Sequence, residues 1–387
     1  MHVTHMNLKN WRNFRDVDIR LGARTYLLGA NASGKSNFLD VFRFLRTLAQ
    51  SEGGGLQRAV KDRGGLKKLR SLHARRDPEV RLALNVIDDT EKDAPITWSY
   101  SLSLKSEGKG QQRVMISEEN VSRNGNIVLK RPNNDDRADP ERLTQTHLEQ
   151  IGANAKFRPL AEFFASVTYL HLVPQLLKHG DKISGRVLEH DPFGQGLLQR
   201  IAKTPTKTRD ARIRRINRAL IQAVPLFSNL RFEQDEISGL WHLEANFTHW
   251  RVHGAWQRED QFSDGTLRLI GLLWALQDGD GPLLLEEPEL SLNDGIVANI
   301  PLMIDRVLQE RKKRTLSRQV LVSTHSETLM QNPYPGVLLL IEPGSNGSTV
   351  REPNKKEYAQ MKHGLTPAEV MLPKTHPEGI KKSDLFT

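Results

Sequence analysis

One octapeptide near the start of the chain restricts the fold more than any other feature. Residues 29–36 read GANASGKS and match the pattern G-x-x-x-x-G-K-[ST]. An apolar run at residues 26–28 precedes them as a buried strand would, and apolar residues then recur at helical spacing from Phe38 to Leu48. A strand, a glycine-rich loop and a helix in this order are typical of α/β domains with a parallel sheet. The pattern therefore predicts an α/β fold.

The chemistry of this loop suits phosphate groups. Its glycines let the backbone approach an anion closely, while successive N–H groups and the helix N-terminus point toward the negative charge. We expect Lys35 to reach the β- and γ-phosphates of a nucleotide and Ser36 to offer its hydroxyl to Mg²⁺. The loop residues expected to contact ATP are Gly29, Asn31, Ser33, Gly34, Lys35, Ser36 and Asn37.

A second motif consists of an apolar strand that ends in two carboxylates. Residues 282–289 read PLLLEEPE. The first acid, Glu286, is placed to hold a metal ion directly or through water, and the second, Glu287, to orient or deprotonate an attacking water. If this motif stood alone, a solvated acidic turn would be the favoured interpretation. Because the chain also contains the phosphate-binding loop at 29–36, a catalytic role for the two acids becomes the stronger interpretation.

Two shorter motifs are weaker by themselves. Ser263 and Gly265 stand before the apolar run 269–276 and form a second potential anion-binding helix N-terminus, although Ser-Asp-Gly is also an ordinary capping turn. His325 follows the apolar strand 320–324, where it could contact a γ-phosphate, although a lone histidine is usually structural.

The remaining pattern indicates a domain interrupted by an insertion. Strand-like stretches at 81–87, 97–104 and 113–117 predict an antiparallel lobe, and 124–139 reads as a solvated loop. The predicted organisation is an N-terminal part of the ATPase domain at 1–140, a mostly helical insertion at 141–228, a C-terminal part at 229–345, and a tail at 346–387.

Composition narrows the choice of chemistry and partners. The chain has no cysteine, so disulfides and thiol chemistry are excluded. Its net charge of +10 attracts polyanions such as DNA, and basic residues cluster at 209–218 and 311–314, although an exposed helix face explains the first run equally well. The sequence shows neither a secretion signal nor a long apolar segment, so we expect a cytoplasmic protein without a membrane partner.

In order, the four motifs resemble the Walker A, signature, Walker B and H-loop elements of ABC-type ATPases. Residues 8–14 (LKNWRNF) and 27–37 are similar to the opening strand and loop of the RecF, SMC and OLD branch, and the Glu-Glu-Pro-Glu-Leu form of Walker B is also typical of it. The resemblance covers 1–105 and 230–345. It implies a mixed sheet with helices, an antiparallel β lobe and a helical insertion.

The resemblance also implies that two copies close head to tail around ATP. Ser263 and Gly265 would then contact the γ-phosphate held by the other copy, residues 291–293 would form the D-loop, and His325 would be the switch histidine. This sequence departs from the pattern at three positions: Glu286 replaces the commoner aspartate, Asp264 replaces a signature glycine, and Asn293 replaces the usual Asp or His. No Q-loop can be placed; Gln57 is the nearest candidate, and we expect it to be a solvated loop residue.

Several functions remain open. The insertion lacks heptads, and the residues after His325 contain no acidic Toprim-like set, so the chain most resembles compact stand-alone ATPases of bacterial defence or DNA repair. That class implies binding of double-stranded DNA and a separately encoded effector, either a nuclease or a toxin. The alternatives are the nucleotide-binding subunit of a membrane transporter and a scaffold that binds ATP without hydrolysing it.

Overall fold

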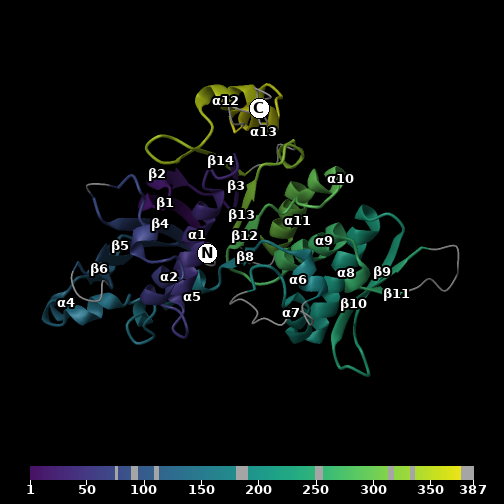
Figure 1. Cartoon of the computed structure of the whole chain (residues 1–387), viewed down its shortest axis with the longest axis horizontal. Coiled ribbons are helices and arrows are strands. Elements are labelled where there is room, and N and C mark those ends of the chain that lie inside the picture. The colour runs from purple at the N-terminus through teal and green to yellow at the C-terminus, as the bar shows by residue number, and fades with distance from the viewer. Residues whose placement is uncertain are drawn as a thin grey trace, which may run out of the picture. The chain divides into compact units, whose positions relative to one another are not determined.

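The computed structural model describes residues 1–74, 77–88, 95–108, 113–179, 191–248, 256–312, 318–331 and 336–375 (Figure 1). The chain forms two compact units that are each built from separate stretches of sequence. Unit 1 contains residues 1–167, 280–284 and 308–387, and unit 2 contains 168–279 and 285–307. The predicted domain boundaries at 140, 228 and 345 stay a prediction.

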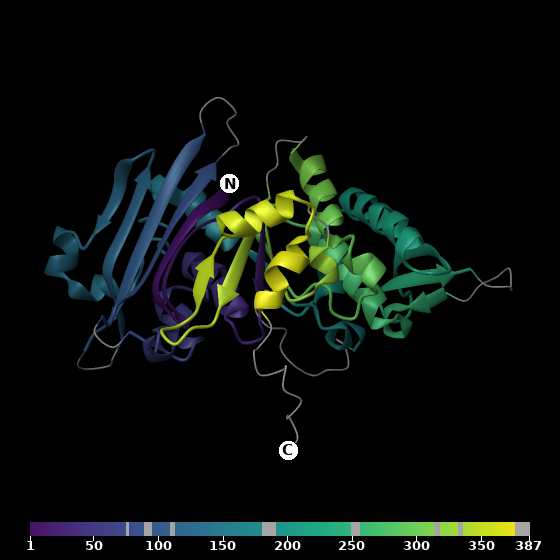
Figure 2. The ribbon, with the colours of Figure 1, turned by 90° about the horizontal axis from the view of Figure 1, so that it is seen from above.

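Unit 1 contains an antiparallel sheet with the strand order β2-β1-β4-β5-β6-β7, whose strands lie side by side in Figure 2. Every neighbouring pair is antiparallel. The sheet confirms the antiparallel lobe expected from the sequence. Its strands are β1 (His2–Trp11), β2 (Phe14–Arg20), β4 (Val80–Asp88), β5 (Ile96–Ser106), β6 (Val114–Arg123) and β7 (Asn126–Arg131).

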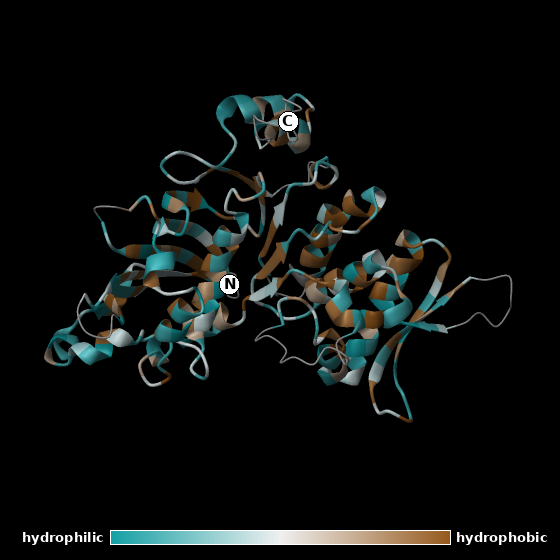
Figure 3. Cartoon of the chain, viewed as in Figure 1, coloured by the Kyte–Doolittle hydropathy of each residue, from teal (hydrophilic) through white to brown (hydrophobic). Residues whose placement is uncertain are grey.

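A second, mixed sheet of unit 1 carries the glycine-rich loop. Strand β3 (Arg24–Gly29) lies between β13 (Val320–Thr324) and β14 (Val337–Glu342) and is parallel to both, while β15 (Thr349–Arg351) pairs antiparallel with β14. The central strands are apolar (Figure 3) because both faces of such a sheet are covered. This sheet confirms the α/β class.

The unit division passes through two elements, the strand β12 (Leu283–Glu286) and the helix α11 (Ile300–Lys312). The first residue of β12 is held in unit 1, where the N–H of Leu283 donates to the carbonyl of Gln319 at 2.8 Å. The Gln319 side chain in turn bonds to the backbone of Val3 and Gly22, which joins the two sheets of unit 1.

The helices of unit 1 include one long helix, α1 (Lys35–Ala49), whose apolar face is buried. The shorter helices are α2 (Leu56–Lys61), α3 (Leu66–Leu69), α4 (Asn134–Ala138), α5 (Arg158–Ala165), α12 (Lys355–Lys362) and α13 (Pro367–Met371). The single 3-10 turns are η1 (Pro140–Thr144), η2 (Ala155–Phe157), η4 (Thr328–Met330) and η5 (Leu372–Lys374).

The prediction of a solvated loop at 124–139 is wrong. This stretch contains β7 and α4, and Arg131 at the end of β7 is only 1% exposed. Its guanidinium donates to the carboxylates of Glu119 and Asp136 at 2.9 and 2.8 Å. The polar composition that suggested a loop belongs in part to this buried cluster, since a buried charge is tolerated when it is paired and hydrogen-bonded.

Unit 2 is built around the helix α9 (Asp264–Gln277), which is apolar nearly all round and packs in the core of the unit. The long helix α8 (Thr206–Ala223) and the antiparallel strands β11-β10-β9 cover this core. The other elements of unit 2 are β8 (Thr168–Leu170), α6 (Pro174–Lys178), α7 (Leu197–Lys203), β9 (Phe227–Gln234), β10 (Trp241–Phe247), β11 (Trp256–Arg258), η3 (Glu259–Gln261) and α10 (Asp294–Val297).

Candidate functional site

The glycine-rich loop runs from the end of β3 to the start of α1. The ammonium of Lys35 donates to the carbonyls of Gly29 at 2.9 Å and Ala30 at 3.1 Å, so this side chain folds back across the loop. Lys35 is buried, whereas Ser36 at the next position is exposed. The loop therefore places a cation and a hydroxyl at the N-terminus of a helix, where backbone N–H groups favour anions.

Glycine is required at two positions of the loop. Gly34 has φ of 116°, and a Cβ there would lie 2.2 Å from Nδ2 of Asn13. A Cβ on Gly29 would lie 2.5 Å from Oγ of Ser33 and 2.8 Å from the carbonyl of Ile341. A side chain at either position would collide with the residues that support the loop, so only glycine allows this close packing.

Ser33 gives a direct indication that a polar ligand fits this loop. Its side chain is 1% exposed, and its Oγ has no hydrogen-bond partner among the described residues. A buried hydroxyl without a partner is costly. A phosphate oxygen in the loop would supply an acceptor, so the residues present fit a bound phosphate chain.

The opening strand motif supports the loop from behind. Nδ2 of Asn13 donates to the carbonyl of Ser33 at 2.8 Å, and the hydroxyl of Ser348 donates to the same carbonyl at 2.7 Å. The indole N–H of Trp11 donates to the carbonyl of Asn37 at 2.9 Å, and the amide of Asn37 donates to Oδ1 of Asn13 at 2.8 Å. Trp11 and Asn13 thus hold the loop and the start of α1 in place through these hydrogen bonds.

Arg12, between these two residues, also contacts α1: its guanidinium pairs with the carboxylate of Asp40 at 2.7 Å. Burial alone would raise the pKa of Asp40, but the nearby guanidinium groups of Arg63, Arg12 and Arg43 outweigh burial and hold it below its ordinary value. Asp40 therefore stays charged and keeps α1 tied to the turn between β1 and β2.

The H-loop candidate lies in unit 1, at the end of the strand next to β3. Thr324 pairs in register with Leu28, directly before the glycine-rich loop, and His325 follows as an exposed residue. Ser323 is fully buried in the same strand, and its Oγ has no partner among the described residues. Register places His325 at the same edge of the sheet as the loop.

The two Walker B acids lie in unit 2. Oε2 of Glu286 accepts the hydroxyl of Tyr169 at 2.5 Å, and Nδ1 of His171 lies 3.2 Å from the backbone carbonyl of Glu286. Glu287 has φ of 46°, so the chain leaves the strand direction directly after Glu286. Tyr169 and His171 were not predicted, since they lie more than a hundred residues away and no local pattern marks them.

The signature turn is a capped helix start. The hydroxyl of Ser263 accepts the N–H of Thr266 at 3.1 Å, and Ser263 itself is exposed. A Cβ on Gly265 would lie 2.6 Å from the carbonyl of Ser291, so glycine is what allows the predicted D-loop to pack against the turn. In unit 2 the structure thus brings the signature and D-loop residues together. Asn293 caps α10 by accepting the N–H of Gly295 at 2.9 Å.

The unusual Asp264 of the signature is neutralised by helix α6. Lys178 donates to Oδ1 of Asp264 at 2.8 Å, and Gln175 donates to Oδ2 at 2.7 Å. The hydrogen bond from Lys178 is the main cause that lowers the pKa of Asp264. The extra negative charge beside Ser263 is therefore compensated within unit 2.

The predicted site residues fall on both units. The loop residues 29–37 and His325 belong to unit 1, and Ser263, Gly265, Glu286 and Glu287 belong to unit 2. Among the described residues, no three acidic, histidine or cysteine side chains are grouped so that they could hold a metal. Magnesium at phosphate sites usually takes one or two protein oxygens and otherwise phosphates and water.

Gln57 is not the loop residue that the sequence suggested. It lies in α2, and its side-chain amide donates to the carbonyls of Val114 and Thr144, at 2.8 Å each. Gln57 therefore ties α2 to the antiparallel lobe.

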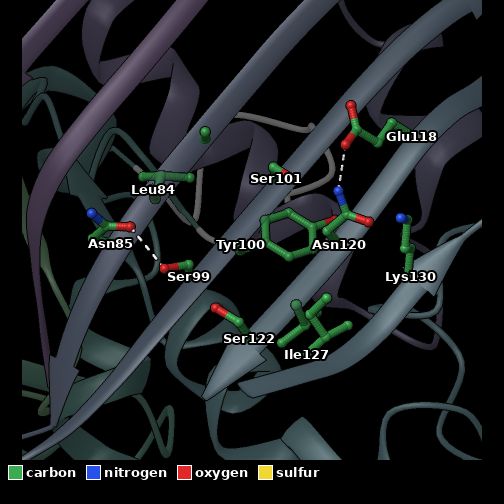
Figure 4. Close-up of a pocket in the computed structure, with 12 residues that line it drawn as sticks. Leu84, Asn85, Ser99, Tyr100, Ser101, Glu118, Asn120, Ser122, Ile127 and Lys130 are labelled. Carbon is green, nitrogen blue, oxygen red and sulfur yellow. Dashed lines mark hydrogen bonds between the residues drawn. The ribbon is translucent and has the colours of Figure 1, made fainter. Parts of the chain in front are cut away.

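A shallow groove of about 280 Å³ lies on the polar face of the antiparallel sheet (Figure 4). Ser99, Asn85 and Asn120 line it together with the exposed Ile127, and Ser99 donates to Oδ1 of Asn85 at 2.9 Å. It contains none of the predicted site residues.

The fold and the loop define a P-loop ATPase domain of the ABC type. Residues 24–331 match the family described as "AAA domain, putative AbiEii toxin, Type IV TA system", a range that contains all four predicted motifs. The chain belongs to this family.

Part of the chain is similar to a DNA replication and repair protein. A stretch of 64 residues is 42% identical to the DNA replication and repair protein RecF of Trichodesmium erythraeum (strain IMS101) and covers 16% of this chain and 15% of that protein. The chain thus matches only a small part of this relative's length.

Two solved SMC structures share the fold. One is the SmcHead bound to the C-winged helix domain of ScpA, with a TM-score of 0.54, 16% identity, and coverage of 92% of this chain and 100% of that one. The other is the Smc head domain with an extended coiled coil, bound to the C-terminal domain of ScpA derived from Pyrococcus furiosus, with a TM-score of 0.52, 14% identity, and coverage of 94% and 98%. Within the described part of the chain, no helix has the length and apolar character needed to cross a bilayer.

Proposed function

We propose that this protein binds and hydrolyses ATP between two copies of itself, arranged head to tail. The observation that carries the proposal is that one chain presents two separate phosphate-directed helix starts, at Lys35 and at Ser263, in different units. Each start combines backbone N–H groups with a polar side chain, which is the usual protein site for phosphate. A second copy supplies the Ser263 turn that completes the loop around Lys35.

Each residue then has a defined task. Lys35 and the N–H groups of the loop bind the β- and γ-phosphates, while Ser263 and Gly265 of the other copy contact the γ-phosphate from the opposite side. Glu287 accepts the proton of the attacking water, and His325 orients the γ-phosphate. Ser36 and Glu286 would hold Mg²⁺, which neutralises charge on the phosphates when it is bound.

Complementation between two inactive variants tests the shared site. Lys35→Ala removes the phosphate-binding cation, and Ser263→Arg blocks the signature turn, so each variant alone should lack ATPase activity. Mixing them yields heterodimers with one intact site, since the wild-type loop of one copy faces the wild-type turn of the other. With equal mixing we expect about a quarter of the wild-type turnover to return.

The controls separate the possible outcomes. Each variant mixed with itself at the same total concentration should stay inactive, and circular dichroism should match the wild type. A Ser263→Arg protein that hydrolyses ATP alone at the wild-type rate would contradict the two-copy site. A wild type that binds ATP without any turnover would instead favour the scaffold alternative.

The Asp264–Lys178 pair should tune how well the signature turn accepts phosphate. In Lys178→Ala the carboxylate beside Ser263 loses its cation, and repulsion of the triphosphate should weaken ATP-dependent dimerisation by about 3- to 10-fold. The double variant Lys178→Ala/Asp264→Asn should recover most of the loss, because the uncompensated charge is gone. Analytical ultracentrifugation with and without ATP measures the dimerisation of the single and the double variant. Equal weakening in the single and double variants would show that charge at Asp264 is irrelevant.

We further propose that ATP-driven dimerisation is coupled to double-stranded DNA, or to a separately encoded nuclease or toxin, in DNA repair or phage defence. The net charge of +10 supports a polyanionic partner. The likeness to a DNA replication and repair protein supports the same assignment.

A further inference from the structure

Helix α8 carries six basic residues, and the structure divides them into two groups with different roles. Three of them are engaged with unit 2. Arg209 lies over the ring of Trp241 at 4.8 Å, Arg212 pairs with Asp278 at 2.7 Å, and Arg215 donates to Gln277 at 3.4 Å. Half of the basic residues of α8 therefore have a structural role within unit 2.

The other three basic residues of α8 form one exposed stripe: Lys207, Arg214 and Arg218. At 100° per residue they lie within about 40° of one another around the helix, and they span about 16 Å along it. Ala211 lies between them on the same face, where a small side chain leaves room for close approach. The only acid of α8, Asp210, pairs with Arg209 at 3.4 Å.

The stripe is held on a rigid support. The opposite face of α8 buries Ile213, Ile216 and Leu220 in the core of unit 2, against β9 and α9 (Figure 1). The cations therefore project from a fixed helix of 18 residues rather than from a flexible segment.

We propose that this stripe binds the phosphate backbone of double-stranded DNA. Over about 16 Å of its axis a duplex presents roughly ten phosphate charges, so each of the three spaced cations can pair with a backbone phosphate along this length without reading bases. The inference rests on the DNA-binding part of the proposed function and assigns that role to a surface.

Other polyanionic partners fit the stripe less well. Helix α8 contains no aromatic residue, so it lacks the stacking platforms that single-stranded nucleic acids use. Its apolar residues Ile213, Ile216 and Leu220 are buried, so α8 has no wide apolar face to insert into a lipid surface as an amphipathic helix does. The one exposed large apolar side chain of α8, Ile221, lies at the end of the stripe, whereas the apolar anchors of protein interfaces lie near the centre of the contact.

The test compares two triple variants that lose the same charge. Lys207→Gln/Arg214→Gln/Arg218→Gln removes the stripe, and Lys355→Gln/Lys356→Gln/Lys362→Gln removes three exposed cations of α12 in unit 1. Binding to a fluorescent 30-base-pair duplex is measured by anisotropy without ATP, over a series of salt concentrations. Basal ATPase activity and circular dichroism confirm that both variants are folded.

We expect the stripe variant to bind the duplex roughly 30- to 300-fold more weakly at low salt, with a slope of log K against log salt shallower by about 2 to 3. The α12 variant should stay within about 3-fold of wild type, with an unchanged slope. Equal binding by the stripe variant and the wild type would overturn the proposal. So would a wild type that binds anionic vesicles or an acidic protein through the stripe but not the duplex.

These outcomes are independent of ATP chemistry. A wild type that binds the duplex through the stripe but shows no ATP-dependent dimer would sustain this inference and contradict the shared ATP site.

Discussion

Replacing Glu287 with glutamine should reduce ATP turnover by about 10²- to 10⁴-fold while ATP still binds. Glutamine has nearly the same shape as glutamate but cannot accept a proton from the attacking water. Because the substitution leaves Lys35 and the glycine-rich loop unchanged, the affinity for ATP should change little. Turnover is followed by phosphate release, and binding is followed with a fluorescent ATP analogue.

The same variant should accumulate as an ATP-bound dimer, since nucleotide that is not hydrolysed keeps the two copies together. Glu236→Gln is a matched control, because Glu236 is an exposed acid in a turn of unit 2. It should keep wild-type turnover and remain monomeric after the ATP is consumed. Equal turnover by the wild type and the Glu287 variant would show that Glu287 is not the base.

Replacing Arg131 with methionine should destabilise unit 1 by about 3–5 kcal/mol. Arg131, Glu119 and Asp136 form a buried cluster, and the side chains of all three are fully inaccessible to solvent. The same guanidinium also donates to the carbonyls of Gln145 and Arg142 at 2.9 and 2.8 Å. Its loss leaves the buried carboxylate of Glu119 without a cation and that of Asp136 with only Arg142, whose Nε lies 3.5 Å away.

The penalty should depend on pH in a defined direction. Burial already raises the pKa of Glu119 in the wild type, whereas burial of Asp136 is outweighed by Arg131, which lowers its pKa. Without Arg131 both acids lose this opposing interaction, so the folded variant should bind protons more tightly than the unfolded chain. Its stability should therefore fall as pH rises, and the difference from the wild type should be larger at pH 8 than at pH 5.

Urea unfolding followed by circular dichroism measures this loss. The control is Arg81→Met, which removes an exposed pair with Glu79 and should cost less than about 1 kcal/mol. A loss below about 1 kcal/mol for Arg131→Met would mean that the buried cluster does not hold the lobe together.

The sequence was sufficient to predict those elements whose conformation depends on residues close together in the chain. The loop at 29–36 was predicted to lie between a strand and a helix, because an apolar run precedes it and apolar residues at helical spacing follow it. Its glycines mark the loop itself, as Gly34 shows with φ of 116°. The apolar strand before Glu286 and the apolar helix after Ser263 were also predicted correctly, since their residues are buried all along their length. The α/β class and the P-loop follow from these short segments.

Contacts between distant residues could not be predicted. Asn13 supports the carbonyl of Ser33, Tyr169 bonds to Glu286, and Lys178 neutralises Asp264, yet each pair is separated by 20 to 117 positions. Their partners are chosen by which strands and helices pack together, and no periodicity records that choice. For the same reason a polar stretch at 124–139 read as a loop, although tertiary packing buries Arg131 within it.

The sequence by itself determined that this chain is a P-loop protein, and it predicted a signature turn and a pair of acids, because those functions require particular residues at short spacing. Only the tertiary structure decided which charges are compensated and which remain exposed. In helix α8 it turned three of six basic residues inward and left Lys207, Arg214 and Arg218 outside, because the apolar residues between them had to enter the core.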